Sequence, residues 1–246
     1  MNKSNLIDPR SVARDVPGLF EIVFPGLTPG LVAHLNATSR TLDGEAIDDD
    51  DVRQAKLGPA LLFEVACVRV DRLFEQDEDA NNPQSCLAEA WRRQSRFYDA
   101  RYVDSIGDND WFIACAVGNS LRGALVDLSR SRGKTVVVRP QVLGCQWISS
   151  SCGDYSIGDC IVEVKCIVGN FSGADYRQVL IYWMLSLIAD SEGRGTAWKQ
   201  AVLVNPRRKL MVDLDLPGFL TMVGRGASHI EMMQRFLAVV GERSPR

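Results

Sequence analysis

The hydrophobic and polar positions divide the chain into a helical first half and a mixed second half. Apolar residues recur at helical spacing from about 52 to 76, and a further helix is predicted over Trp111–Arg130. Between them, NNPQ breaks the pattern, and the polar stretch CLAEAWRRQSRFYDARYV predicts another helix. Residues 1–47 are rich in glycine, proline and short apolar pieces, which predicts an accessory segment with one or two short helices. The acidic run at 48–51 is interpreted as a solvated helix start, favoured by the helix dipole.

From residue 134 the pattern becomes that of a sheet. KTVVVRPQVLG predicts one strand, GDYSIGDCIVEVKC two more, and AVLVNPRRKLMVDLDL two strands around an Asn-Pro turn. A helix is predicted in DYRQVLIYWMLSLIADSEG, and a last helix begins near Ser228, which forms a capping box with Glu231. The order of these elements predicts the α/β class. We divide the chain into a mostly helical N-terminal accessory segment, 1–107, and a second domain, 108–246.

Composition narrows the classes of protein that fit. The 246 residues are 46% hydrophobic and 24% charged, which suits one globular domain with or without an accessory segment. The net charge of −3 gives no general indication of nucleic-acid binding. No apolar run is long enough to span a membrane, and no stretch of signal-peptide type is present. Seven cysteines without a C-x-x-C motif favour a reduced, cytoplasmic location.

The stretch GDYSIGDCIVEVKC carries charges within a predicted hairpin. If Gly158-Asp159 forms a two-residue turn, Asp154 faces Glu163, and strand alternation puts Lys165 on the same side. Opposed like charges are destabilising, and a cation bound by both carboxylates removes the conflict. Oxygen ligands of this kind suit Mg²⁺ or Mn²⁺. The alternative is an exposed edge hairpin with a solvated Glu-Lys pair. The opposite side, assigned to the core, carries Tyr155, Ile157, Val162 and Val164.

The following helix adds two polar positions. Gln178 and Tyr182 are four residues apart and share one helix face, while apolar residues occupy the rest of the helix. A glutamine is an unusual choice within such an apolar run, so we expect it to face the carboxylates. For Tyr182, plain core packing is an equal alternative.

These residues resemble the motifs of the PD-(D/E)XK nuclease superfamily. The pattern D154-x8-E163-V-K165 is followed by RQVLIY with Gln178 and Tyr182, although glycine stands where the first motif usually has proline. The order of elements over about 110–215 resembles the restriction-endonuclease-like α-β-β-β-α-β core, which makes 108–246 a nuclease-like domain. The resemblance implies Asp154 and Glu163 as metal ligands, the Val164 carbonyl as a third candidate ligand, and Mg²⁺ or Mn²⁺ as cofactor. It implies that Lys165 handles the attacking water, with Gln178 and Tyr182 as accessory residues.

The resemblance also implies a further acid on an early helix. Glu64 and Glu89 are the candidates, although both are expected as plain surface residues. The implied function is metal-dependent hydrolysis of phosphodiester bonds in DNA, in restriction, phage defence or repair. Three basic clusters could contact a DNA backbone: Arg92, Arg93 and Arg96; Arg130, Arg132 and Lys134; Arg207, Arg208 and Lys209. The alternatives are a non-catalytic binding or assembly module on the same fold, with a protein partner or a second copy, and a ribonuclease toxin.

Overall fold

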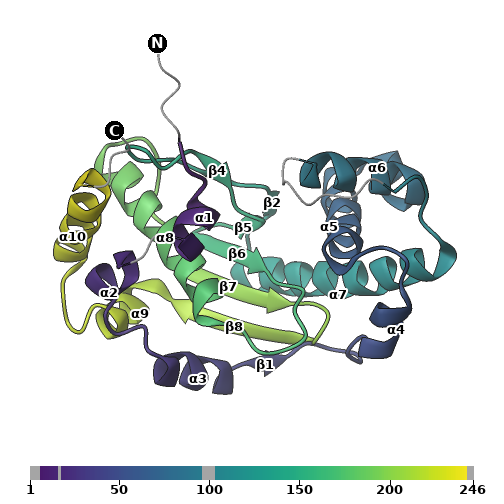
Figure 1. Ribbon diagram of the computed structural model, residues 1–246, viewed down its shortest axis with the longest axis horizontal. Coiled ribbons are helices and arrows are strands. Elements are labelled where there is room, and N and C mark those ends of the chain that lie inside the picture. Colours follow the sequence, from purple (N-terminus) through teal and green to yellow (C-terminus); the bar gives the residue numbers. More distant parts are fainter. Residues whose placement is uncertain (1–5, 16–17, 96–102, 243–246) are drawn as a thin grey trace, which may run out of the picture.

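The protein folds around a mixed sheet with helices against both faces (Figure 1). This is a computed structural model, and it describes residues 6–15, 18–95 and 103–242. The strands of the main sheet follow the order β1-β8-β7-β6-β5-β2. Their bounds are Arg40–Thr41 (β1), Val136–Val138 (β2), Tyr155–Ile157 (β5), Cys160–Val164 (β6), Gln200–Asn205 (β7) and Leu210–Asp215 (β8). A separate small sheet pairs β3 (Gln141–Val142) with β4 (Ser151–Cys152).

Strands β6 and β7 run parallel, while every other described pair in the main sheet is antiparallel. Parallel neighbours require a crossover connection, and helix α8 (Gly173–Ser191) provides it. Helix α7 (Asp108–Arg132) lies on the opposite face of the sheet from α8. The chain from α7 onward therefore has the order α7-β2-β5-β6-α8-β7, interrupted only by the small sheet, and the predicted mixed α/β class is confirmed.

The remaining helices lie around this core. Figure 1 shows α4, α5 and α6 gathered at one end of the sheet, with α2, α9 and α10 toward the other end. Their bounds are Pro9–Asp15 (α1), Leu19–Val23 (α2), Pro29–Ala37 (α3), Asp49–Gln54 (α4), Pro59–Glu75 (α5), Pro83–Gln94 (α6), Leu216–Val223 (α9) and His229–Glu242 (α10), with a 3₁₀ helix at Glu78–Asn81. The segment predicted to be accessory thus supplies helices that pack on α8 and a strand, β1, that pairs with β8.

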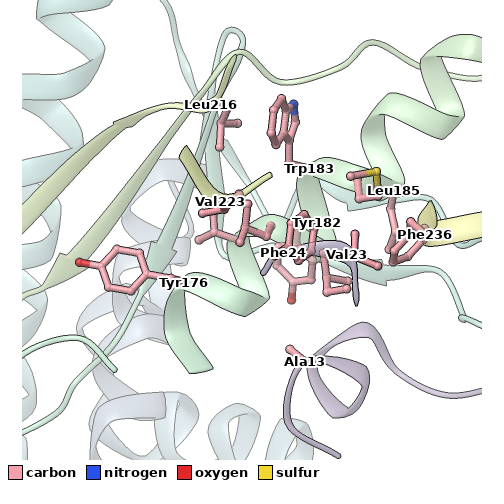
Figure 2. Close-up of a cluster of buried hydrophobic side chains, with 14 of the residues drawn as sticks. Ala13, Val23, Phe24, Tyr176, Tyr182, Trp183, Leu185, Leu216, Val223 and Phe236 are labelled. Atoms are coloured by element: carbon pink, nitrogen blue, oxygen red, sulfur yellow. The ribbon is translucent and has the colours of Figure 1, made fainter. Parts of the chain in front are cut away.

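Helix α8 is buried over most of its surface, as expected for a helix with apolar residues on most of its faces. Figure 2 shows part of the cluster around it, with Val23 of α2, Phe24 just after this helix, and Phe236 of α10 beside its side chains. Ala13 of α1 belongs to the same cluster. On the other face of the sheet, a second cluster joins α5 and α7 to the strands. Its strand residues include Tyr155, Ile157, Val162, Val202 and Val204.

Several predicted boundaries were wrong, for reasons of local backbone geometry. The helix expected over 52–76 is split, because Pro59 starts α5 at its first turn, where a missing N–H costs nothing. The strand expected from 134 is broken where Arg139, at φ 50°, precedes Pro140. Helix α9 was not predicted. The polar helix after NNPQ ends at Gln94 as α6, and its expected continuation over 96–102 lies outside the described residues.

The predicted helix starts are confirmed. The side chain of Asp48 accepts a hydrogen bond from the N–H of Asp50 at the start of α4. Before α10, the Ser228 hydroxyl accepts from the Glu231 N–H, and the Glu231 carboxylate accepts from the Ser228 N–H. Both arrangements satisfy N–H groups that a helix leaves without partners in its first turn.

A buried hydrogen bond between the sheet and α5 yields a stability prediction. The Tyr155 hydroxyl donates to Asp71 Oδ1 over 2.6 Å, and both residues are buried. We expect Tyr155→Phe to lower the free energy of unfolding by about 1–3 kcal/mol, because a buried carboxylate oxygen loses its donor. The matched control is Tyr176→Phe, whose hydroxyl makes only a long 3.4 Å contact with Asn36, and it should cost less. Urea unfolding of both variants checks this, and equal losses would contradict it.

Candidate functional site

The hairpin that carries the predicted carboxylates has the predicted register. Ser156 pairs with Ile161 in the middle of the β5–β6 ladder, so the next pair outward from Tyr155 and Val162 is Asp154 with Glu163. The turn contains Gly158 at φ 61°, a conformation that glycine adopts without strain. The side chains assigned to the core, among them Tyr155 and Val162, belong to the cluster under α5 and α7.

The part of this face that carries Glu163 is covered by α8 and is closed to water. Glu163 is only 2% exposed and Gln178 only 7% exposed. Gln178 Nε2 donates to Glu163 Oε1 over 2.7 Å and to the Tyr182 hydroxyl over 3.0 Å. Lys165 Nζ donates to Glu163 Oε1 over 2.9 Å and to Gln178 Oε1 over 2.8 Å. The alternative of a solvated edge hairpin is therefore wrong, and the buried glutamine is explained by its polar neighbours.

Asp154 lies at the more open end of the site and has a partner that sequence reasoning missed. Arg10 of α1 donates from Nη2 to Asp154 Oδ1 over 3.1 Å and from Nε to the Tyr182 hydroxyl over 3.0 Å. The other carboxylate oxygen, Oδ2, accepts from the backbone N–H of Val164 over 2.8 Å. We expected a bound metal cation to relieve the repulsion between Asp154 and Glu163, but in the structure each carboxylate already forms an ion pair with a side chain of the protein. No sequence spacing indicates a contact between residues 144 positions apart.

Glu163 is buried, and one of its carboxylate oxygens makes no hydrogen bond. Its Oε2 atom is buried and has no hydrogen-bond partner. Burial, followed by the nearby charge of Asp154, raises the pKa of Glu163 to about 7, although Lys165 and Arg10 oppose the shift. For Lys165, burial lowers the pKa, but the charges of Glu163 and Asp154 outweigh it and the net shift is upward. Lys165 is therefore an ammonium that donates hydrogen bonds at neutral pH.

The chemistry of these groups fits one divalent cation. Carboxylate oxygens are the ligands that Mg²⁺ and Mn²⁺ prefer, and the orphaned Oε2 of Glu163 offers such a ligand in a site where a buried acceptor is otherwise costly. Asp154 is the cross-strand neighbour of Glu163, and it accepts a hydrogen bond from the backbone N–H of Val164. Within the described ranges, no group of three His, Cys, Asp or Glu side chains could hold a metal ion. Most ligands of a bound ion would then have to be water or substrate, as is common for Mg²⁺.

The two early-helix acids are not the plain surface residues that we expected. Glu64 on α5 pairs with Arg93 over 3.4 Å, and its pKa is raised, first by burial and in part by the charge of Asp154. Glu64 therefore lies within electrostatic range of the site. Glu89 instead binds Arg92 and Arg93, and the hydrogen bonds from Arg92 lead the effects that lower its pKa to about 2.

The basic clusters are largely occupied within the fold. Arg207 is only 5% exposed and pairs with Asp49 over 2.6 Å, so its assignment as a DNA contact was wrong. Arg93 is bound by Asp71 over 2.7 Å, and Arg132 by Gln200. Arg96 lies outside the described residues. The candidates that stay exposed are Arg92, Arg130, Lys134 and Arg208.

A large groove lies elsewhere on the molecule. It has a volume of about 710 Å³ and runs between α2, α3 and the start of α8, with Phe20, Phe24 and Arg177 in its walls. Neither Asp154 nor Glu163 lines it. Grooves of this size are the usual first candidates for ligand sites, but two polar side chains in its walls already have partners: Asn36 binds the backbone of Phe171, and Arg177 lies over the ring of Phe20. We therefore place the candidate site at the hairpin.

Comparisons of the chain with protein-family models, with curated proteins and with solved structures found no match. Within the part of the chain that the structure describes, no helix has both the length and the apolar character needed to cross a membrane.

The raised pKa of Glu163 predicts a pH-dependent stability. A carboxyl group that keeps its proton to a higher pH when folded makes the native state bind more protons than the unfolded chain between about pH 4.5 and 7, so the free energy of unfolding falls as the pH rises through this window. Above this pH window, each unit by which folding raises the pKa of Glu163 lowers the free energy of unfolding by about 1.4 kcal/mol. The measurement is urea unfolding in EDTA at a series of pH values from 5 to 8.5. We expect the free energy of unfolding to fall across this range in the wild type but not in Glu163→Gln. Parallel curves for the two proteins would contradict the assignment.

Proposed function

We propose that this protein is a metal-dependent nuclease with a restriction-endonuclease-like core, and that DNA is its substrate. The order α7-β2-β5-β6-α8-β7 supports the proposed core, because it matches the α-β-β-β-α-β order that the motifs imply. The observation that carries the proposal is the convergence of Asp154, Glu163, Lys165, Gln178 and Tyr182 in one hydrogen-bonded site in which the buried Glu163 Oε2 has no partner.

Each residue has a role that its contacts support. Asp154 and Glu163 would hold the cation, next to the backbone of Val164. When bound, Mg²⁺ supplies Lewis-acid polarisation of the phosphodiester and lowers the pKa of the attacking water. The Lys165 ammonium can orient that water and stabilise negative charge in the transition state. Gln178 holds Glu163 and Lys165 in place through its amide, and Tyr182 supports the amide of Gln178.

One observation favours a second candidate, a non-catalytic binding or assembly module on the same fold. Asp154 and Glu163 are already neutralised by Arg10 and Lys165, so the fold does not require a metal to balance its charges. On this alternative, the charge pairs serve stability or contact with a partner, and no phosphodiester is cut.

A substrate panel separates the two candidates. Purified protein is incubated with supercoiled plasmid, linear duplex, single-stranded DNA and RNA, each with Mg²⁺, with Mn²⁺ and with EDTA. The nuclease proposal predicts cleavage of DNA with either metal and none in EDTA. Cleavage of RNA alone would move the assignment to a ribonuclease. No cleavage of any substrate would favour the non-catalytic module.

A further inference from the structure

Arg10 forms an ion pair with Asp154, one of the two carboxylates that the proposed metal site needs. Its guanidinium contacts Asp154 Oδ1 over 3.1 Å, the Tyr182 hydroxyl over 3.0 Å and, more distantly, the carbonyl of Cys152 over 3.4 Å. Asp154 Oδ2 is bound by a backbone N–H, so both oxygens of this carboxylate already have donors. Of the carboxylate oxygens of Asp154 and Glu163, only Glu163 Oε2 has no hydrogen-bond partner within the described residues.

The helix that presents Arg10 is anchored without it. Ile7, just before α1, donates its N–H to the Trp147 carbonyl and accepts from the Ser149 N–H, each over 2.9 Å. Within α1, Val12 is fully buried in the cluster around α8. The Asp8 carboxylate accepts from the Ser151 hydroxyl over 3.2 Å. Arg10 is therefore held at the site by a docked helix, and replacing it should leave α1 in place.

The Arg10–Asp154 pair is of a kind that can open. The side chain of Arg10 is 38% exposed and that of Asp154 is 25% exposed, so water reaches both. Ion pairs that are open to solvent contribute only about 0–1 kcal/mol. In contrast, Lys165 is 19% exposed and is held by the buried Glu163 and Gln178. Of the two cations at the site, Arg10 is thus the more exposed, and its departure should cost less than that of Lys165.

We propose that Arg10 is an internal competitor for the metal: its guanidinium neutralises Asp154 in the metal-free protein and must leave this carboxylate when a divalent cation binds. Two positive groups on one carboxylate repel each other, and water screens this repulsion only in part because Asp154 is 25% exposed. The N-terminal helix α1 therefore sets the metal affinity of the site and holds the metal-free protein in a latent state. This inference rests on the proposed function, because it concerns the same metal site.

The test is a Mn²⁺ titration followed by electron paramagnetic resonance at pH 8.5, which is above the pKa of about 7 that Glu163 has in the wild type. That pH is needed because Arg10 lowers the pKa of Glu163, so its removal would favour protonation near neutral pH. We expect Arg10→Ala to bind Mn²⁺ on the order of 10-fold more tightly than the wild type. Arg10→Lys keeps the charge without the planar fork and should lie between them. Arg14→Ala, an exposed arginine of the same helix, should match the wild type.

The direction of the change separates this role from a merely structural one. A residue that only supports the fold would weaken Mn²⁺ binding when removed, and thermal unfolding in EDTA shows whether each variant is folded. Tighter binding by Arg10→Ala, or binding by this variant alone, supports the inference. Equal or weaker binding than the wild type overturns it and leaves the proposed function standing. If neither protein binds Mn²⁺, the proposed metal site fails, and the inference fails with it.

Discussion

Asp154→Asn should reduce Mg²⁺-dependent cleavage by on the order of 10³-fold while the protein stays folded. The variant removes one of the two negative charges that would hold the cation, and a loss of this size corresponds to about 4 kcal/mol of transition-state stabilisation. The fold should survive, because an asparagine oxygen can still accept the N–H of Val164. The ion pair with Arg10 is partly exposed, so its loss should cost about 1 kcal/mol or less.

The matched control for this variant is Asp159→Asn in the turn of the same hairpin. Asp159 is exposed, and the contacts that the structure shows for it use its backbone carbonyl, which accepts from the N–H groups of Lys199 and Gln200. Single-turnover cleavage of plasmid at saturating Mg²⁺ should therefore be unchanged in this control. If Asp154→Asn cleaves as fast as Asp159→Asn, Asp154 has no part in the chemistry.

Lys165→Met should separate the chemical step from metal binding. The methionine keeps much of the length of the side chain but removes the ammonium that donates to Glu163 and Gln178. We expect the single-turnover rate to fall by on the order of 10²–10⁴, the range for one charge-stabilising or proton-handling group. Mn²⁺ binding should persist, because both carboxylates remain. The pKa of Glu163 should rise further without Lys165, so both measurements belong at pH 8.5.

Lys199→Met, which replaces an exposed lysine just before β7, is the control for loss of a positive charge. Its rate should match the wild type. A Lys165→Met protein that cleaves at the wild-type rate would reduce Lys165 to a buried partner of Glu163. A variant that loses its fold together with its metal would assign the lysine a structural role, and this result would favour the non-catalytic module.

The hairpin was predictable because its information is local. Alternation along a strand and a short glycine turn define which residues face each other, and the register of β5 and β6 agrees with both. The shared face of Gln178 and Tyr182 follows in the same way from helical periodicity, and their hydrogen bond confirms it. Local rules failed where one residue changes the backbone, as at Pro59 and at Arg139.

The burial and the charge balance of the site were not predictable, because they depend on contacts between distant segments. The sequence shows that Glu163 lies in a strand, but not that α8 covers it and leaves it 2% exposed. Arg10 lies in a stretch that reads as accessory, and it approaches Asp154 only because α1 packs on α8. The prediction for Arg207 failed for the same reason. In the sequence this residue belongs to a basic cluster that could contact DNA, but in the fold it is buried against Asp49.

The central claim is that a divalent cation held by Asp154 and Glu163 is needed for cleavage of DNA. The most direct measurement is the rate of plasmid cleavage at pH 8.5 as a function of Mg²⁺ concentration, for the wild type and for Glu163→Gln. We expect a wild-type rate that is zero in EDTA, rises with Mg²⁺ and saturates, while the variant stays at background at every concentration. A wild type without Mg²⁺-dependent cleavage, or a Glu163→Gln curve that overlays the wild-type curve, would contradict it.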